Sequence, residues 1–180
     1  MTVKLNTSEL VHLSKLLLEC ALLLHLLLGS MRTPIQQHEI ENFFDRYDSL
    51  VNEALTNGEP DIDEAVNSFA TDFIEASPNG VIVGKNEETF REAIVKGWAF
   101  YREIGIQSMD ILSSQITILD NFHAMVKIHW NCSFIRKNNS KGDIAFDVHY
   151  FLQKGDDDNL RIFGYITGDE QQALKDEGLI

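Results

Sequence analysis

The chain of 180 residues is long enough to bury one hydrophobic core and too short for two domains of ordinary size, so the sequence predicts one globular domain. The composition, with 44% hydrophobic residues and only 3 prolines, excludes disordered and collagen-like proteins. A formal net charge of -13 argues against nucleic-acid binding, because the 15 basic residues are scattered and form no stripe that could neutralise phosphates.

Residues 1–30 precede the predicted domain of residues 31–180 and are rich in leucine. Lys15 and Glu19 interrupt this apolar stretch and no cleavage site of small residues follows it, which weighs against a secretion signal. We expect an extra N-terminal helix that packs on the domain or on a second subunit. Two alternatives stay open, namely translation that starts at Met31 and attachment to a membrane.

Three helices and a hairpin are predicted next. The first helix opens at a capping box over Thr33–Gln36, and a shorter helix opens at a second box over Asp61–Glu64. The turn formers Ser77–Gly80 then join two short strands. A third helix is capped by Asn86 and stopped by Gly105. Its predicted inner side carries Phe90, Ile94, Val95, Trp98 and Tyr101.

The remainder of the chain has the pattern of strands. Two long runs between residues 122 and 153 alternate with period two, which predicts adjacent strands with one apolar face. We expect strands before and after this pair, over residues 107–119 and 160–167, and a last helix capped by Asp169. Helices followed by a run of strands indicate an α+β fold, with helices packed on one face of a bent antiparallel sheet.

Two cysteines, Cys20 and Cys132, lie far apart, and neither belongs to a Cys-x-x-Cys pair. We therefore expect reduced thiols in a cytoplasmic protein. The sequence contains no glycine-rich phosphate loop, no Gly-x-Ser-x-Gly elbow and no His-Glu-x-x-His helix, so it predicts neither a cofactor nor a metal.

The segment Phe69–Gly80, placed between a short capped helix and a longer one, resembles the helix-to-hairpin signature of the NTF2-like superfamily, in particular its SnoaL-like and ketosteroid-isomerase-like branches. The resemblance extends over about residues 33–167. It implies a cone-shaped (cystatin-like) barrel of three helices on a strongly bent sheet, with an apolar pocket at its mouth. The superfamily includes both enzymes and non-catalytic association domains, so the fold does not determine the function.

Catalytic residues implied by this resemblance are mostly missing. The ketosteroid-isomerase-like enzymes place a general-base aspartate directly before the hairpin proline, where this chain has Ser77. Their partner acid falls near Tyr150, where the inward face carries no carboxyl group. Only the oxyanion-donating tyrosine has a match, which is Tyr47. Ketosteroid isomerase chemistry is therefore not expected.

Two groups of residues are candidates for a site. Aromatic side chains on the predicted inner faces would together line the pocket, although each alone is more typical of a core: Tyr47, Phe69, Phe73, Trp98, Tyr101, Trp130, Phe146 and Tyr150. The catalytic candidates are Tyr47, Asp72, His129, Asp147 and His149. The last three share the outer face of the central strand pair, where a dimer contact is the simpler interpretation; a one-residue rotation would bring them into the pocket.

The resemblance and the predicted pocket leave two functions open. The first is binding of a small hydrophobic or aromatic molecule, with cofactor-free proton transfer of the isomerase, cyclase or dehydratase type. The second is a non-catalytic binding or association module. We expect a homodimer through the outer sheet face in both cases. An acidic or histidine side chain inside the pocket would favour the enzyme.

Overall fold

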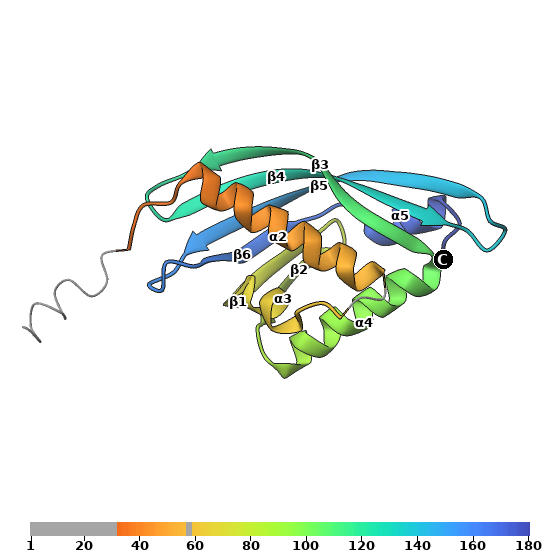
Figure 1. Cartoon of the computed structure of the whole chain (residues 1–180), viewed down its shortest axis with the longest axis horizontal. Helices are drawn as coiled ribbons and strands as arrows, with labels where there is room; N and C mark the ends of the chain where they lie inside the picture. The colour runs from red at the N-terminus through yellow and green to blue at the C-terminus, as the bar shows by residue number, and fades with distance from the viewer. Residues whose placement is uncertain (1–31, 57–58) are drawn as a thin grey trace, which may run out of the picture. The chain divides into compact units, whose positions relative to one another are not determined.

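The computed structural model describes residues 32–56 and 59–180 (Figure 1). The elements, in chain order, are α2 (Gln37–Leu55), α3 (Ile62–Asn67), β1 (Phe69–Ser77), β2 (Gly80–Lys85), α4 (Glu88–Ile104), β3 (Ile106–Ile118), β4 (His123–Ile135), β5 (Lys141–Lys154), β6 (Leu160–Ile166) and α5 (Glu170–Asp176). The predicted order and α+β class are confirmed. The helix predicted within residues 1–30 lies outside the described residues. In the described part, no helix combines the length and apolar character that a membrane span needs.

The strands form one sheet in the order β2-β1-β6-β5-β4-β3. Strands β3 to β6 make the predicted antiparallel meander, and β1 and β2 make the predicted hairpin. The pair of β1 and β6 is parallel, which differs from the predicted antiparallel sheet. This pair is free to be parallel because α4 and four strands intervene between its members, so no tight turn forces them to run in opposite directions.

The core lies against the inner face of the sheet, where α2 crosses the strands (Figure 1). In β4 every second residue is buried and the intervening ones are half-exposed, so the predicted face assignment is confirmed there. The buried members of β4 are Ala124, Val126, Ile128, Trp130, Cys132 and Phe134. Burial of these side chains, each stabilising by about 1.5–3 kcal/mol when large and apolar, holds β4 against the hydrophobic core.

The first described helix begins later than predicted. Its N-cap is Gln36 instead of Thr33, and the backbone N–H of Gln36 donates to Glu39 Oε2 at 2.8 Å. The reason is tertiary: Ile35 is 3% exposed, and its backbone N–H donates to the carbonyl of Asn121 at 2.7 Å. This contact holds Ile35 against the β3–β4 turn, so the helix begins after it.

The start of α4 also differs from the prediction. Its N-cap is Glu87, because the Asn86 side chain donates instead to the carbonyls of Val66 at 2.8 Å and Phe69 at 3.0 Å. The helix ends at Gly105 as predicted, in the left-handed conformation with φ 98°. Val95 was expected to face inward but is 48% exposed, since it lies one position beyond the stripe that contacts the core.

Candidate functional site

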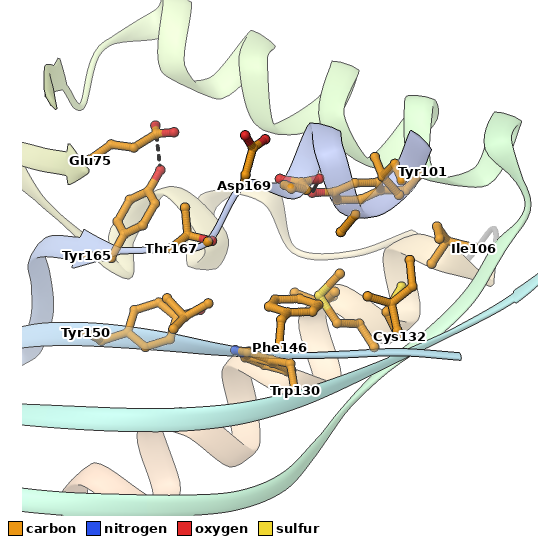
Figure 2. Close-up of a pocket in the computed structure, with 18 of the residues that line it drawn as sticks. Glu75, Tyr101, Ile106, Trp130, Cys132, Phe146, Tyr150, Tyr165, Thr167 and Asp169 are labelled. Carbon is orange, nitrogen blue, oxygen red and sulfur yellow. Dashed lines mark hydrogen bonds between the residues drawn. The ribbon is translucent and has the colours of Figure 1, made fainter. Parts of the chain in front are cut away.

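A cavity of about 360 Å³ lies between the inner face of the sheet and helices α2, α4 and α5 (Figure 2). Figure 2 shows Trp130, Phe146 and Tyr150 on the side of the strands, with Glu75 and Asp169 on the opposite side, nearer to α4. Its volume is within the usual range of small-molecule sites.

All of the aromatic residues predicted for the pocket line this cavity, except Phe73. The ring of Phe73 packs instead on Phe69 and Phe90, with ring centroids 5.2 and 4.7 Å apart. It also lies so close to Gly84 on the paired strand that any Cβ at that position would overlap the ring. Phe73 is therefore a core residue that joins the β1–β2 hairpin to α4, and the expectation that it lines the pocket is corrected.

Tyr47 reaches the cavity from α2, between the rings of Phe69, Trp130 and Tyr150 at centroid distances of 6.3 to 6.4 Å. Burial raises the pKa of Tyr47 to about 12, so its hydroxyl stays protonated at neutral pH. Among the described residues, Tyr47 makes ring contacts and its hydroxyl forms no hydrogen bond. The hydroxyl is thus available to a molecule in the cavity.

Two tyrosine–carboxylate pairs lie on the wall of the cavity. The Tyr165 hydroxyl donates to Glu75 Oε2 at 2.7 Å (Figure 2), and the Tyr101 hydroxyl donates to Glu170 Oε1 at 2.5 Å. Burial, together with the neighbouring carboxylate, raises the pKa of both tyrosines well above its ordinary value. Both hydroxyls therefore act as hydrogen-bond donors at any physiological pH.

The acidic side chains of this wall were not among the residues predicted for the site. Glu75 comes from β1, whereas Asp169 and Glu170 come from the start of α5. Asp169 caps α5, as predicted, by accepting from the backbone N–H of Gln172 at 3.0 Å. The inward orientation of Glu75 could have been predicted from strand alternation, because Glu75 lies two residues after the buried Phe73 and so faces the same side of β1.

The polar group of the central strands faces away from the cavity. His129 Nδ1 lies 2.8 Å from Asp147 Oδ1, and Lys127 Nζ lies 2.7 Å from Asp147 Oδ2. The hydrogen bond from Lys127, with a further one from His129, holds the pKa of Asp147 below its ordinary value. His149 stands opposite Lys127 in the strand register. The structure thus brings these residues together on the outer face, with none of them in the lining of the cavity.

The remaining candidate positions also lie apart from the cavity. Asp72 is exposed on β1 and stands opposite Lys85 of β2, and Ser77 stands opposite Gly80 at the tip of the hairpin. Cys132 does line the cavity, and burial raises the pKa of its thiol to about 12. Within residues 32–56 and 59–180, no group of three or more His, Cys, Asp or Glu side chains could hold a metal ion.

Comparison with known proteins gives matches to a family and to solved structures. The sequence model described as NTF2-like protein (DUF6841) matches residues 38–170. No curated protein matches significantly. An NTF2-like protein with a cystatin-like fold from Novosphingobium aromaticivorans is similar with a TM-score of 0.57 and 13% identity, over 89% of this chain and 94% of that one.

Two further solved structures have the same fold. An NTF2-like protein of unknown function from Shewanella oneidensis MR-1 has a TM-score of 0.55 and 18% identity, over 75% of this chain and 100% of that one. A protein from Xanthomonas campestris assigned as a calcium/calmodulin-dependent protein kinase II association domain has a TM-score of 0.55 and 13% identity, over 74% of this chain and 87% of that one. At these identities the similarity establishes the fold alone.

Proposed function

The chain belongs to the NTF2-like protein family (DUF6841), and we propose that it uses the cavity inside this fold to bind a small, largely apolar molecule. The wall of the cavity supports this most directly. Aromatic and aliphatic side chains from α2, α4 and the sheet surround a volume of about 360 Å³, and a few polar groups converge on it. That combination is typical of sites that bury an apolar molecule and orient it by hydrogen bonds.

The polar groups of the wall suit proton-transfer chemistry on such a ligand. A carboxylate such as Glu75 can accept a proton, and a protonated hydroxyl such as that of Tyr47 can stabilise a developing oxyanion. When they take place next to a carbonyl group, isomerisation, cyclisation and dehydration can all begin with these two roles. The reaction that we propose for the cavity is therefore cofactor-free proton transfer. Glu75 would act as the general base, because Ser77 stands where related enzymes have an aspartate in that role.

Filling the cavity should strongly weaken ligand binding. Ala173 of α5 lines the cavity, and Ala173→Phe would place a ring in the space that a ligand needs. Trp98 and Trp130, the two tryptophans of the chain, both line the cavity, so their fluorescence reports binding directly. We expect titration with adamantylmethanol, a neutral and compact apolar probe, to give a dissociation constant at least about tenfold higher for Ala173→Phe than for the parent protein.

The matched control is Gln171→Phe, which adds the same ring to the exposed side of α5, outside the lining. It should bind the probe as the parent protein does. A saturable fluorescence change that persists unaltered in Ala173→Phe would show that the probe binds elsewhere, and would contradict the proposal.

Removing the Tyr47 hydroxyl should weaken binding and leave the fold intact. In Tyr47→Phe the ring packing is retained, so we expect the free energy of unfolding to change by less than about 1 kcal/mol. The dissociation constant of adamantylmethanol should rise by about 2- to 12-fold, which corresponds to one hydrogen bond. If both quantities equal those of the parent protein, the hydroxyl only fills the core.

A second candidate function is that of an association module, and the similarity to the Xanthomonas campestris protein favours it. Large apolar side chains are exposed along β3 and after it, among them Leu112 at 57% and Leu119 at 55%. We propose that the outer side of the sheet contacts a second copy of the chain. Light scattering on the purified protein would contradict this if it returned the mass of one chain at micromolar concentration.

A further inference from the structure

The charged side chains on the cavity wall all have the same sign. Glu75, Asp169 and Glu170 belong to the lining, and among the described lining residues there is no lysine, arginine or histidine. Glu75 and Asp169 are half-buried, whereas Glu170 is exposed at the rim. A ligand that enters past α5 therefore meets negative charge before it reaches the apolar interior.

The interior beyond these carboxylates is built from aromatic rings. Four rings from four different elements turn toward one space, namely those of Tyr47, Trp130, Tyr150 and Tyr165. The Tyr150 and Tyr165 centroids lie 6.3 Å apart. The face of an aromatic ring carries negative potential and attracts a cation that lies within about 6 Å of its centroid. The rings and the carboxylates thus favour the same kind of ligand.

The hydrogen bonds already present leave acceptors on this wall. Glu75 accepts one bond from Tyr165, but an ionised carboxylate has about four lone-pair sites. The hydroxyl oxygen of Tyr165, which donates its proton to Glu75, can itself accept from a ligand N–H. A positively charged nitrogen placed beside this pair would gain charge-assisted hydrogen bonds and a ring face together.

We propose that the ligand of this cavity is a protonated amine carried on a compact apolar body. This inference rests on the proposed function, since it assigns a chemical class to the molecule that the cavity binds. The apolar body packs against Trp130 and Phe146 on the strands, and the ammonium group lies at Glu75 and Tyr165. The net charge of -13 attracts cations toward the protein as a whole and repels carboxylates.

Three probes with one apolar body test the class of ligand. Adamantylmethylamine is a cation, adamantylmethanol is neutral and adamantanecarboxylate is an anion at pH 7, and none of them absorbs light where tryptophan does. We expect titrations followed by Trp98 and Trp130 fluorescence to give the tightest binding for the amine, at least about tenfold tighter than for the carboxylate. The preference should decrease as salt is added, since the rim carboxylate is exposed.

Substitutions separate the local effect of Glu75 from the overall charge. Glu75→Gln should reduce the preference for amine over alcohol by about fivefold or more. Glu92→Gln removes one charge from the exposed side of α4, outside the lining, and should leave the preference unchanged. Equal effects of the two substitutions would overturn the placement of the amine at Glu75.

The outcomes also distinguish this inference from the proposed function. If the alcohol binds and the amine binds no more tightly than the carboxylate, the inference is wrong while binding of an apolar molecule stands. If none of the three probes changes the tryptophan fluorescence and none raises the thermal unfolding midpoint, both proposals are contradicted.

Discussion

Gly105→Ala should lower the free energy of unfolding by about 3 kcal/mol, the largest loss that we expect from adding a single methyl group to this protein. Gly105 ends α4 with φ 98°, a conformation that costs an alanine about 1–2 kcal/mol. An added Cβ would also overlap the carbonyl oxygen of Ile135, which belongs to the adjoining strand β4. Because the backbone N–H of Ile135 donates to the Gly105 carbonyl at 2.9 Å, neither segment can move freely to relieve the overlap.

Gly97→Ala is the matched control, and it should change the free energy of unfolding in the opposite direction. Gly97 lies in the interior of α4, and a Cβ there would meet no atom within 4 Å. Alanine in a helix interior is more favourable than glycine by about 0.5–1 kcal/mol, so this variant should be slightly more stable than the parent protein. Urea denaturation of all three proteins measures both changes. A Gly105→Ala variant as stable as the parent would contradict the geometry of the α4–β3 connection.

Lys154→Met should cost about 2–3 kcal/mol of stability, because it breaks an ion pair whose cation is almost fully buried. Lys154 is 1% exposed, and its Nζ lies 2.8 and 3.0 Å from the two carboxylate oxygens of Glu39. Methionine keeps the apolar stem in place but leaves Glu39 without that partner. Glu39 is 30% exposed and can recover some hydration, so the loss should lie below that of a fully buried pair.

The control for this variant is Lys96→Met. Lys96 pairs with Glu92 on the surface of α4 at 2.9 Å, with side chains 75% and 58% exposed, so the change should lie within about 0.5 kcal/mol. If both substitutions had the same small effect, burial of Lys154 would contribute nothing to the strength of its ion pair.

Acidification should reduce the difference in the free energy of unfolding between Lys154→Met and the parent protein. Burial acts to raise the pKa of Glu39, but hydrogen bonds from Lys154 and Gln36 and the charge of Lys154 outweigh it, and the pKa lies below its ordinary 4.5. A carboxyl group with a lowered folded-state pKa stabilises the protein above the unfolded-state value, and this stabilisation is lost as the pH falls through the folded-state pKa. Urea denaturation of both proteins at a series of pH values from 7 to below 4.5 would show whether their free energies of unfolding converge.

Strand alternation predicted the central part of the fold correctly because β4 and β5 pair without interruption. Their register runs unbroken from His123 opposite Gln153 to Ile135 opposite Lys141. With no bulge, a period of two determines which side chains face the helices. The opposite placement of Trp130 and His129, and with it the position of the outer polar group, therefore follows from the sequence.

The same rule fails for Tyr165, which explains why this residue was not predicted to line the cavity. Ile162 is buried, so strict alternation along β6 turns Gly164 inward and Tyr165 outward. The register is irregular between Phe151 and Leu152, where β6 carries an extra residue, and Tyr165 stands opposite the inward-facing Tyr150. A bulge of this kind reverses the faces beyond it, and nothing local in the sequence marks its position.

Errors at helix ends have a different cause. Thr33 and Asn86 are both favourable N-cap residues, but distant parts of the chain determine where these helices begin. The strand turn at Asn121 holds Ile35, and the carbonyls of Val66 and Phe69 bind the Asn86 side chain. Such tertiary hydrogen bonds outweigh the contribution of about 1 kcal/mol that a cap makes, and a local motif cannot anticipate them.

The parallel pairing of β1 with β6 also determines when the sheet can be completed during synthesis. Strand β1 is made early, but one of its edges has no partner until β6 leaves the ribosome. At about 5–20 residues per second, the nascent chain carries this open edge for on the order of ten seconds. An unpaired edge next to apolar side chains is where newly made chains associate with one another. Aggregation during expression should therefore arise mainly in that interval, before the last strand closes the sheet.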